Sequence, residues 1–398
     1  MVSNLRVAWL LSYISIASFS ATIVTPALPF IQLQFGLQSG QVEWVVSAFL
    51  IGYVIGQLIY GPLANRWGRV YALRFGLVIN MIGILLCITS LAFNSYWLLL
   101  VGRMISALGA AGGLACTFML INEWLAAEQR KTAMAYTILS FTFGIGLAVT
   151  LGGLLTEYWN WTYCFPFLFA HGVIMFLGTW VFSETLQKPQ AINLVTMIHN
   201  YKQALSSGTL VLFALVVGLG SAIGYCFSAA GPQIANDVLH LSAADYGYWN
   251  LINMVGMLLG GLWAKKLLNQ IKAIQVINVG LGGCALGIMS IMAMNYIHSM
   301  SAAWFFLSTF VLYLFTGLLF SGGSFIASNA LADKANSSSM MSFINMSTAT
   351  VAVVIMGYLS ASPLQAFVGI LGVMWMIVAS LLLLNSLLRR APRQVAEL

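Results

Sequence analysis

The sequence is poor in charged residues. Asp, Glu, Lys and Arg together make up only 6% of its 398 residues, whereas 61% are hydrophobic. The mean hydropathy is +0.93, and soluble globular domains carry about 25% charged residues. A water-soluble protein is therefore excluded. Proline is scarce as well, with 8 residues, and the regular apolar–polar alternation of a membrane β-barrel is missing. These absences leave a membrane protein built from helices.

Signals of cofactor or metal chemistry are missing too. The four histidines are scattered, and no G-x-x-x-x-G-K-[ST] loop for nucleotide phosphates occurs. The cysteines lie within or at the edge of apolar runs without metal-ligand spacing, which favours packing over disulfides; they are Cys87, Cys116, Cys164, Cys226 and Cys284. We therefore expect no cofactor, no metal site and no enzymatic activity.

Apolar segments long enough to cross a bilayer of about 30 Å recur along the whole chain. The sequence predicts an all-α polytopic membrane protein with twelve transmembrane helices, over residues 7–30, 43–64, 71–92, 97–122, 132–156, 163–182, 209–231, 243–264, 273–293, 302–328, 338–361 and 364–388. An even number of spans places both termini on one side of the membrane.

The basic residues test this count. Fifteen of the 16 lysines and arginines fall on one side of the predicted membrane, and the loops on the opposite side contain none. The positive-inside rule makes the basic side cytoplasmic, so we expect both termini in the cytoplasm. The membrane that we expect is a bacterial inner membrane. The net charge of +7 then reflects orientation, and nucleic acid is not an expected partner.

The longest predicted cytoplasmic segment divides the chain into equal parts. We predict an N-terminal six-helix bundle (1–182), a cytoplasmic linker (183–208) and a C-terminal six-helix bundle (209–398). A weak internal echo supports the division, because a shift of 200 residues lays Gly56, Gly61, Ala64 and Arg66 over Gly256, Gly261, Ala264 and Lys266. Two repeated halves with a site between them are typical of transporters, and we expect a monomer.

A short polar stretch, GPLANRWGR at residues 61–69, separates the second and third spans. Glycine and arginine are common in any short inner loop. The stretch nevertheless resembles the signature loop G-x-L-A-D-R-x-G-R-K/R of the major facilitator superfamily, with matches at Gly61, Leu63, Ala64, Arg66, Gly68 and Arg69. The resemblance implies a two-bundle fold with a gating loop here. Asn65 replaces the usual acidic residue, which predicts a weaker latch at this gate.

Other stretches extend the resemblance over the chain. LLVGRMISALGAAGG is similar to a motif with a membrane-embedded arginine, here Arg103. GIGLAVTLGGLL resembles the antiporter signature G-x-x-x-G-P-x-x-G-G at Gly144, Gly152 and Gly153, although Ala148 and Val149 replace the usual Gly-Pro. TPALP at 25–29, ETL at 184–186 and the stretch 225–247 are similar to the bicyclomycin-resistance-type group of drug:proton antiporters.

Ionisable side chains inside a membrane are costly and often functional. Two roles that need not exclude each other are open to Arg103. It can bind backbone carbonyls of the first helix near Thr25 and Pro26, and it can serve substrate binding or proton coupling. His171 is either a neutral packing residue or a coupling group. Glu43, at the start of the second span, could lie near Arg103 and is a third coupling candidate. No carboxylate lies clearly at mid-membrane, where proton-driven relatives usually carry one.

The resemblance implies a central cavity lined by polar residues of several helices, some of which also serve helix packing. The predicted substrate-binding residues are Arg103, Tyr225, Asn253, Tyr53, Asn345 and Ser324. One embedded positive charge without an embedded negative one favours a neutral or anionic solute.

The sequence thus predicts a secondary active transporter that works by alternating access. The resemblance implies proton-coupled export of a drug, siderophore or metabolite, with a small-molecule substrate, protons and the lipid bilayer as partners. Uptake or facilitated diffusion of a neutral or anionic nutrient is the first alternative. A transporter-like membrane sensor that moves nothing is the second.

Overall fold

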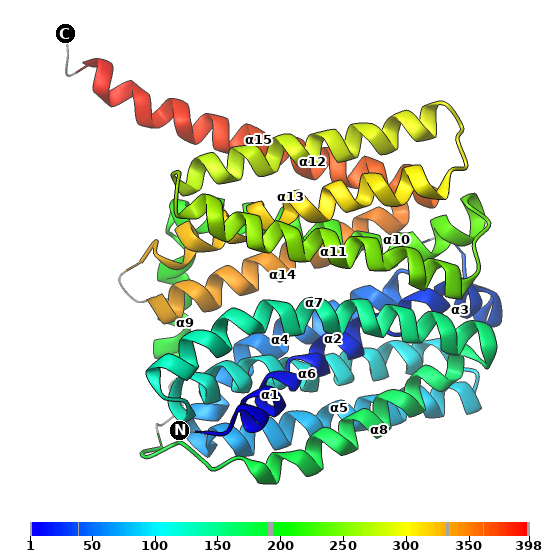
Figure 1. The fold of residues 1–398 in the computed structure, drawn as a ribbon, viewed down its shortest axis with the longest axis horizontal. Coiled ribbons are helices and arrows are strands. Elements are labelled where there is room, and N and C mark those ends of the chain that lie inside the picture. The colour runs from blue at the N-terminus through cyan, green and yellow to red at the C-terminus, as the bar shows by residue number, and fades with distance from the viewer. Residues whose placement is uncertain (1, 39, 190–193, 332–333, 361, 396–398) are drawn as a thin grey trace.

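The protein is described by a computed structural model covering residues 2–38, 40–189, 194–331, 334–360 and 362–395. The elements of these residues are helical (Figure 1). They are α1 (Asn4–Ser12), α2 (Ser15–Thr22), η1 (Thr25–Ala27), α3 (Leu28–Phe35), α4 (Trp44–Trp67), α5 (Arg69–Ala92), α6 (Tyr96–Trp124), α7 (Ala127–Tyr158), η2 (Trp161–Tyr163), α8 (Cys164–Gly178), η3 (Thr179–Val181), α9 (Leu194–Leu205), α10 (Gly208–Gln233), η4 (Ile234–Val238), α11 (Ala243–Leu268), α12 (Ala273–Tyr296), α13 (Ala302–Ser328), α14 (Lys334–Leu359) and α15 (Pro363–Val395).

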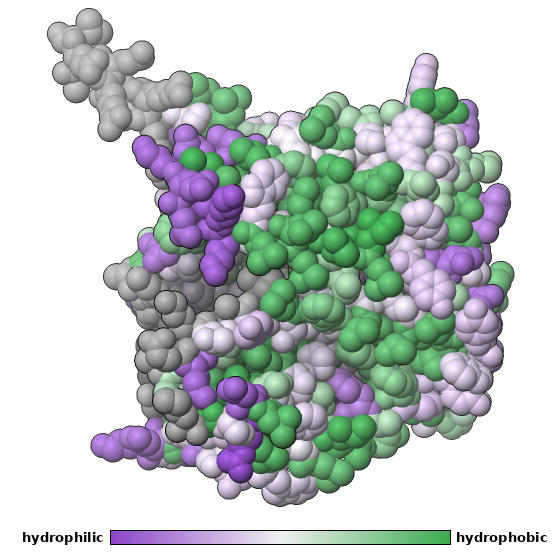
Figure 2. Space-filling model, viewed as in Figure 1, coloured by the Kyte–Doolittle hydropathy of each residue, from purple (hydrophilic) through white to green (hydrophobic). Residues whose placement is uncertain are grey.

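The predicted all-α fold with twelve spans is confirmed. Within the described residues, 12 helical stretches are long and apolar enough to cross a membrane. Figure 2 shows apolar side chains across the middle of one face and a cluster of hydrophilic ones toward its left side. Most predicted spans match the helices to within a few residues, but the fifth begins earlier, at Ala127 in place of residue 132.

The first span is broken into short pieces. α1 and α2 are separated by a turn at Tyr13 and Ile14, and the 3₁₀ segment η1 precedes α3. Pro26 and Pro29 have no N–H to donate to the preceding turn, so the helix cannot continue regularly there. The carbonyls that end α2 consequently need partners from elsewhere in the protein.

The helices form two groups (Figure 1). Residues 4–181, here the N-terminal half, lie below residues 208–395, the C-terminal half, and both termini point to the left of the view. We call the end of the molecule that carries Arg69 and Lys266 the basic end. The opposite end, where α4 begins at Trp44 and α14 ends at Leu359, is the neutral end.

The segment between the halves contains a helix that the sequence analysis did not assign. This helix, α9, is amphipathic in sequence, and Ala204 near its end is fully buried. Ala204 packs in a small apolar cluster with Leu210 of α10 and Met340 of α14. The segment therefore docks on the C-terminal half at the basic end.

The halves meet at the neutral end. Trp44 Nε1 donates to the Tyr358 hydroxyl at 2.8 Å, and Thr150 Oγ1 donates to the Gly247 carbonyl at 3.2 Å. Beside the first of these bonds, Gly40 has a φ of +88° and its Cα lies against Gly357, where two backbones approach too closely for side chains. The neutral end is thus closed by contacts between the halves.

Candidate functional site

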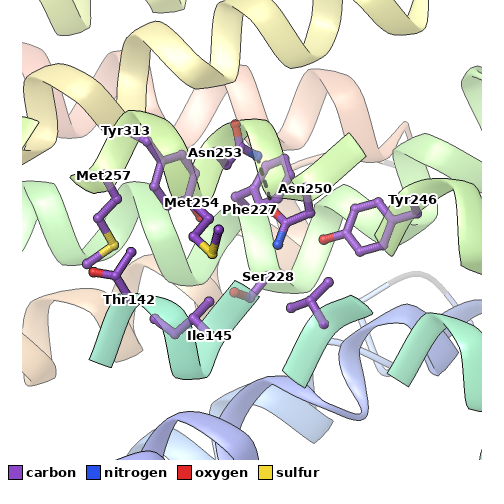
Figure 3. Close-up of a pocket in the computed structure, with 11 residues that line it drawn as sticks. Thr142, Ile145, Phe227, Ser228, Tyr246, Asn250, Asn253, Met254, Met257 and Tyr313 are labelled. Atoms are coloured by element: carbon purple, nitrogen blue, oxygen red, sulfur yellow. Dashed lines mark hydrogen bonds between the residues drawn. The ribbon is translucent and has the colours of Figure 1, made fainter. Parts of the chain in front are cut away.

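A cavity lies between the two halves (Figure 3). α7 forms one wall, and α10, α11 and α13 form the other. It has room for about one or two water molecules in this conformation. It is lined by Thr142, Ile145, Val149, Phe227, Ser228, Tyr246, Asn250, Asn253, Met254, Met257 and Tyr313.

Hydrogen-bonding groups in this cavity are held in place by a buried network. Thr309 Oγ1 donates to Asn253 Oδ1 at 2.8 Å, and Asn253 Nδ2 donates to Asn250 Oδ1 at 3.2 Å. Because this bond fixes the orientation of the Asn250 amide, its Nδ2 points into the cavity (Figure 3). Across the cavity, Thr142 Oγ1 is buried without a partner. A solute that bonds to these groups would satisfy both of them.

Apart from Ser228, the remaining wall is apolar or aromatic, and it carries no charge. Phe227, Met254 and Met257 supply apolar surface, and Tyr246 and Tyr313 add rings with hydroxyl groups. Methionine side chains adapt to irregular shapes. An unpaired ion in such surroundings would lose its hydration without compensation. The cavity therefore suits an uncharged solute that combines an apolar body with hydrogen-bonding groups.

Among the predicted substrate-binding residues, Asn253 lines this cavity. Tyr225 of α10 lies near Tyr53 and Tyr313. Asn345 Oδ1 and Ser324 Oγ are buried without partners. These four predicted residues are not among the lining residues, so their role in binding stays a prediction.

Several lining residues escaped the sequence analysis, notably Tyr246, Tyr313 and Thr142. A signal for α11 was available, because Tyr246, Asn250, Asn253 and Met257 recur at spacings of four, three and four. Such residues share one face of a helix. Nothing in the sequence showed that this face meets α7 of the other half.

Arg103 is fully buried and bound to backbone. It is 1% exposed, and its guanidinium donates to the carbonyls of Ser20 at 2.5 Å, Ala21 at 3.2 Å and Val45 at 3.3 Å. It also lies 4.6 Å from the centre of the Phe49 ring. The carbonyls of Ser20 and Ala21 belong to the last turn of α2. Arg103 therefore supplies hydrogen-bond donors that the broken first span cannot supply itself. This geometry is the backbone-binding alternative weighed for Arg103.

The other two coupling candidates lie apart from the cavity. His171 Nε2 is 3.2 Å from Ser15 Oγ, and its ring stacks on Phe19 inside the N-terminal half. Glu43 lies at the neutral end against Gly357. The sequence analysis placed Glu43 near Arg103, but among the described residues no ion pair joins the two, and the guanidinium faces carbonyls.

The predicted gating loop contains the end of α4 and the beginning of α5, at the basic end. Gly68 has a φ of +114°, a conformation that favours glycine. Arg69 binds Glu123 through Nε and Nη2, with a shortest distance of 2.7 Å, and donates from Nη1 to the Ala64 carbonyl. Gly61 faces open space and Arg66 is exposed. Asn65 is half-buried.

Glu184 caps α5 from a distant part of the chain. Its carboxylate accepts from the N–H groups of Arg69 at 2.8 Å and Val70 at 3.0 Å. Gly68, the residue at the N-cap, has no side chain to do this. A carboxylate at a helix N-terminus also interacts favourably with the helix dipole.

We therefore expect Glu184→Ala to lower the free energy of unfolding by about 1 kcal/mol, the usual loss for a removed N-cap. Glu184→Gln keeps one acceptor oxygen and should retain about half of the effect. Thermal unfolding of the purified protein in detergent measures both variants. Equal midpoints for Glu184→Ala and the unchanged protein would contradict the capping role.

The glycines of the antiporter-like motif permit close helix contacts. A Cβ at Gly144 would meet Ser18 Oγ, and one at Gly152 would meet the backbone of Ile23, both within the N-terminal half. A Cβ at Gly153 would meet the Ala243 carbonyl of the C-terminal half. Gly153 therefore contributes to closure of the neutral end.

The described residues contain no group of three or more His, Cys, Asp or Glu side chains arranged to hold a metal ion.

Comparison with known families gives one match over most of the chain. The family model described as "Major Facilitator Superfamily" matches residues 10–356. The chain is 24% identical over 255 residues to "Multidrug resistance protein D" of Escherichia coli (strain K12), covering 64% of this chain and 63% of that relative. The match thus spans less than two thirds of that relative.

Two further proteins are similar. The chain is 28% identical over 332 residues to a "D-xylose transporter" of Levilactobacillus brevis, covering 77% of this chain and 69% of the relative. The crystal structure of a "D-xylose-proton symporter" superimposes with a TM-score of 0.78 at 16% identity, covering 96% of this chain and 97% of the other. These proteins are transporters or a resistance protein, which agrees with the expectation that the chain is not an enzyme.

Proposed function

Because the chain belongs to the Major Facilitator Superfamily, we propose that it is a secondary active transporter that moves a small organic solute across the membrane by alternating access. In this mechanism the two halves rock about a shared central site, which opens to one side of the membrane at a time.

One observation carries this proposal. The cavity lies between α7 of one half and α10, α11 and α13 of the other, and contacts between the halves close the molecule at the neutral end. Rocking of the halves would break these contacts and change the cavity at the same time. By the positive-inside rule the neutral end faces outward, so the described conformation is the one closed to the outside.

The direction of transport belongs to the proposal. Export of a drug, siderophore or metabolite in exchange for protons is supported by the similarity to Multidrug resistance protein D and by the antiporter-like glycines. The same proposal includes a bacterial inner-membrane location with both termini in the cytoplasm. It also includes a monomer divided into 1–182, 183–208 and 209–398.

A second candidate is uptake of a neutral nutrient. It is supported by the similarity to a D-xylose transporter, together with a cavity wall that holds amides and hydroxyl groups and no charged side chain. Both candidates use the same cavity and differ in the direction of solute movement relative to the proton gradient.

Counterflow in proteoliposomes separates these candidates. A panel of neutral, anionic and cationic aromatic solutes, together with D-xylose, is tested with and without a pH gradient. We expect neutral solutes to be moved in preference to ions of the same size. Acceleration of efflux by an opposing proton gradient supports export, and accumulation of D-xylose supports uptake. Binding without movement of any solute would contradict the proposal and favour a sensor.

Asn250→Ala tests the cavity itself. Loss of one hydrogen bond to the solute costs about 1 kcal/mol, so the apparent affinity should fall by roughly fivefold to tenfold. Asn329→Ala, which removes an exposed amide far from the cavity, is the matched control and should leave counterflow unchanged. The same counterflow with both variants would contradict a solute site at Asn250.

A further inference from the structure

A buried carboxyl group lies in the closed neutral end. Glu43 immediately precedes α4 and is 6% exposed. Its side chain lies beside Gly357 of α14, so it is enclosed between the two halves. Glu43 Oε2 has no hydrogen-bond partner in these surroundings.

Groups from α10, α6, α14 and the segment before α4 lie around this carboxyl. Gln233 of α10 lies close enough to influence the pKa of the carboxyl. Gln233 Nε2, like Glu43 Oε2, has no hydrogen-bond partner. The backbone groups of Gly40 and of Glu43 itself also influence the pKa of the carboxyl. Tyr96 of α6 and Tyr358 of α14 lie nearby. Tyr96 donates its hydroxyl to the Gln41 carbonyl, and Tyr358 accepts from Trp44.

No cation is among the groups that act on Glu43 in the described part of the chain. Burial is the largest influence and raises the pKa of the Glu43 carboxyl, because a charge loses its hydration there. A protonated carboxyl also gains an O–H donor, whereas an ionised carboxylate would have only the hydrogen-bonding groups of Gly40, Gln233 and its own backbone to replace its hydration.

We infer that Glu43 is a proton-binding site whose protonation holds the neutral-end gate closed. The gate consists of Gly40, Glu43, Trp44, Gly357 and Tyr358. Opening the gate exposes the carboxyl to water on the neutral side, where it releases its proton. Closure requires that a proton from the same side be bound again. The inference rests on the proposed alternating-access function and adds a site through which external pH controls the gate.

The sign of the pH dependence follows from these states. The open gate leaves Glu43 near the ordinary glutamate pKa of about 4.3, and the closed gate raises that pKa. Below about pH 4.3 both states hold the proton and closure is strongest. As pH rises toward the raised pKa of the closed state, the ratio of closed to open protein falls by up to tenfold per pH unit.

The gate can be measured without any transported solute. Spin labels at Gln38→Cys and Leu359→Cys report the distance across the neutral end in lipid nanodiscs, and the five native cysteines are buried and need not be removed. We expect the open population of otherwise unchanged protein to increase as pH is raised. Glu43→Gln, which resembles the protonated side chain, should stay closed at every pH. Glu157→Gln is the matched control, because this exposed carboxylate also contacts the other half, at Ala243.

The inference is overturned if the double-labelled protein without further changes shows no pH dependence, a result that does not depend on how any Glu43 variant folds. It is equally overturned if Glu43→Gln titrates with the same midpoint and slope, or if Glu157→Gln removes the effect while Glu43→Gln does not. Loss of counterflow with an intact gate titration would contradict the transport proposal and leave the proton site standing.

Discussion

Arg103→Met is expected to destabilise the protein strongly, with a fall in the thermal unfolding midpoint of the order of 10 °C. The substitution removes the donors that bind three buried carbonyls, those of Ser20, Ala21 and Val45. Each carbonyl left without a partner costs about 1–3 kcal/mol. Methionine fills much of the space of the arginine side chain. The loss of stability therefore reflects the missing hydrogen bonds more than an empty cavity.

Arg103→Lys provides a graded comparison. Lysine keeps the positive charge, but a single ammonium group cannot span carbonyls that lie on two helices as a planar guanidinium does. We therefore expect a stability between those of the methionine variant and the unchanged protein. Fluorescence-detected thermal unfolding in detergent gives the three midpoints.

The two roles weighed for Arg103 predict different outcomes. A residue that serves only substrate or proton coupling could be replaced by methionine with the midpoint retained and only transport lost. If Arg103 instead supplies hydrogen bonds that the broken first span needs, its replacement by methionine lowers the unfolding midpoint and abolishes transport together. Unchanged stability of Arg103→Met would therefore contradict the role inferred from its backbone contacts.

Much of the fold follows from sequence patterns that depend on the bilayer. Apolar runs of sufficient length define spans whatever their neighbours are, and the described helices reproduce the twelve predicted ones. The break at η1 has a local signal in Pro26, because proline lacks the N–H that a helix needs, although the first span was predicted as one stretch over 7–30. Such features are local, so a single segment contains the information.

The candidate site was harder to predict because it depends on contacts between distant segments. Asn253 was identified as a polar residue in a span, but its bond to Asn250 and the position of Thr142 opposite them depend on how α7 meets α11. Arg103 illustrates the same limit. Its embedded charge left backbone binding and substrate or proton coupling both open, and the carbonyls that it binds, those of Ser20, Ala21 and Val45, depend on how the helices pack.

Gly153→Val is expected to keep the neutral end open and to reduce counterflow by more than tenfold. A Cβ at this position would collide with the Ala243 carbonyl of the other half, and main-chain atoms cannot move aside as a flexible side chain can. Overpacking of this kind costs about 1–3 kcal/mol, and opening the neutral end relieves it. The ratio of open to closed protein should therefore rise by roughly fivefold to 150-fold.

Two further valine substitutions separate gating from folding. Gly152→Val meets the backbone of Ile23 within the N-terminal half, so rocking of the halves gives no relief and the unfolding midpoint should fall. Gly282→Val faces open space on α12 and should change neither quantity.

Spin labels at Tyr158→Cys and Asp237→Cys, both exposed at the neutral end, measure the distance across the opening. Thermal unfolding of the same variants gives the midpoint. If Gly153→Val left that distance distribution unchanged while lowering the midpoint as Gly152→Val does, the contact with Ala243 would be ordinary packing. A shift in the distances at a retained midpoint is expected instead, because the overlapping atoms belong to halves that can separate without either one unfolding.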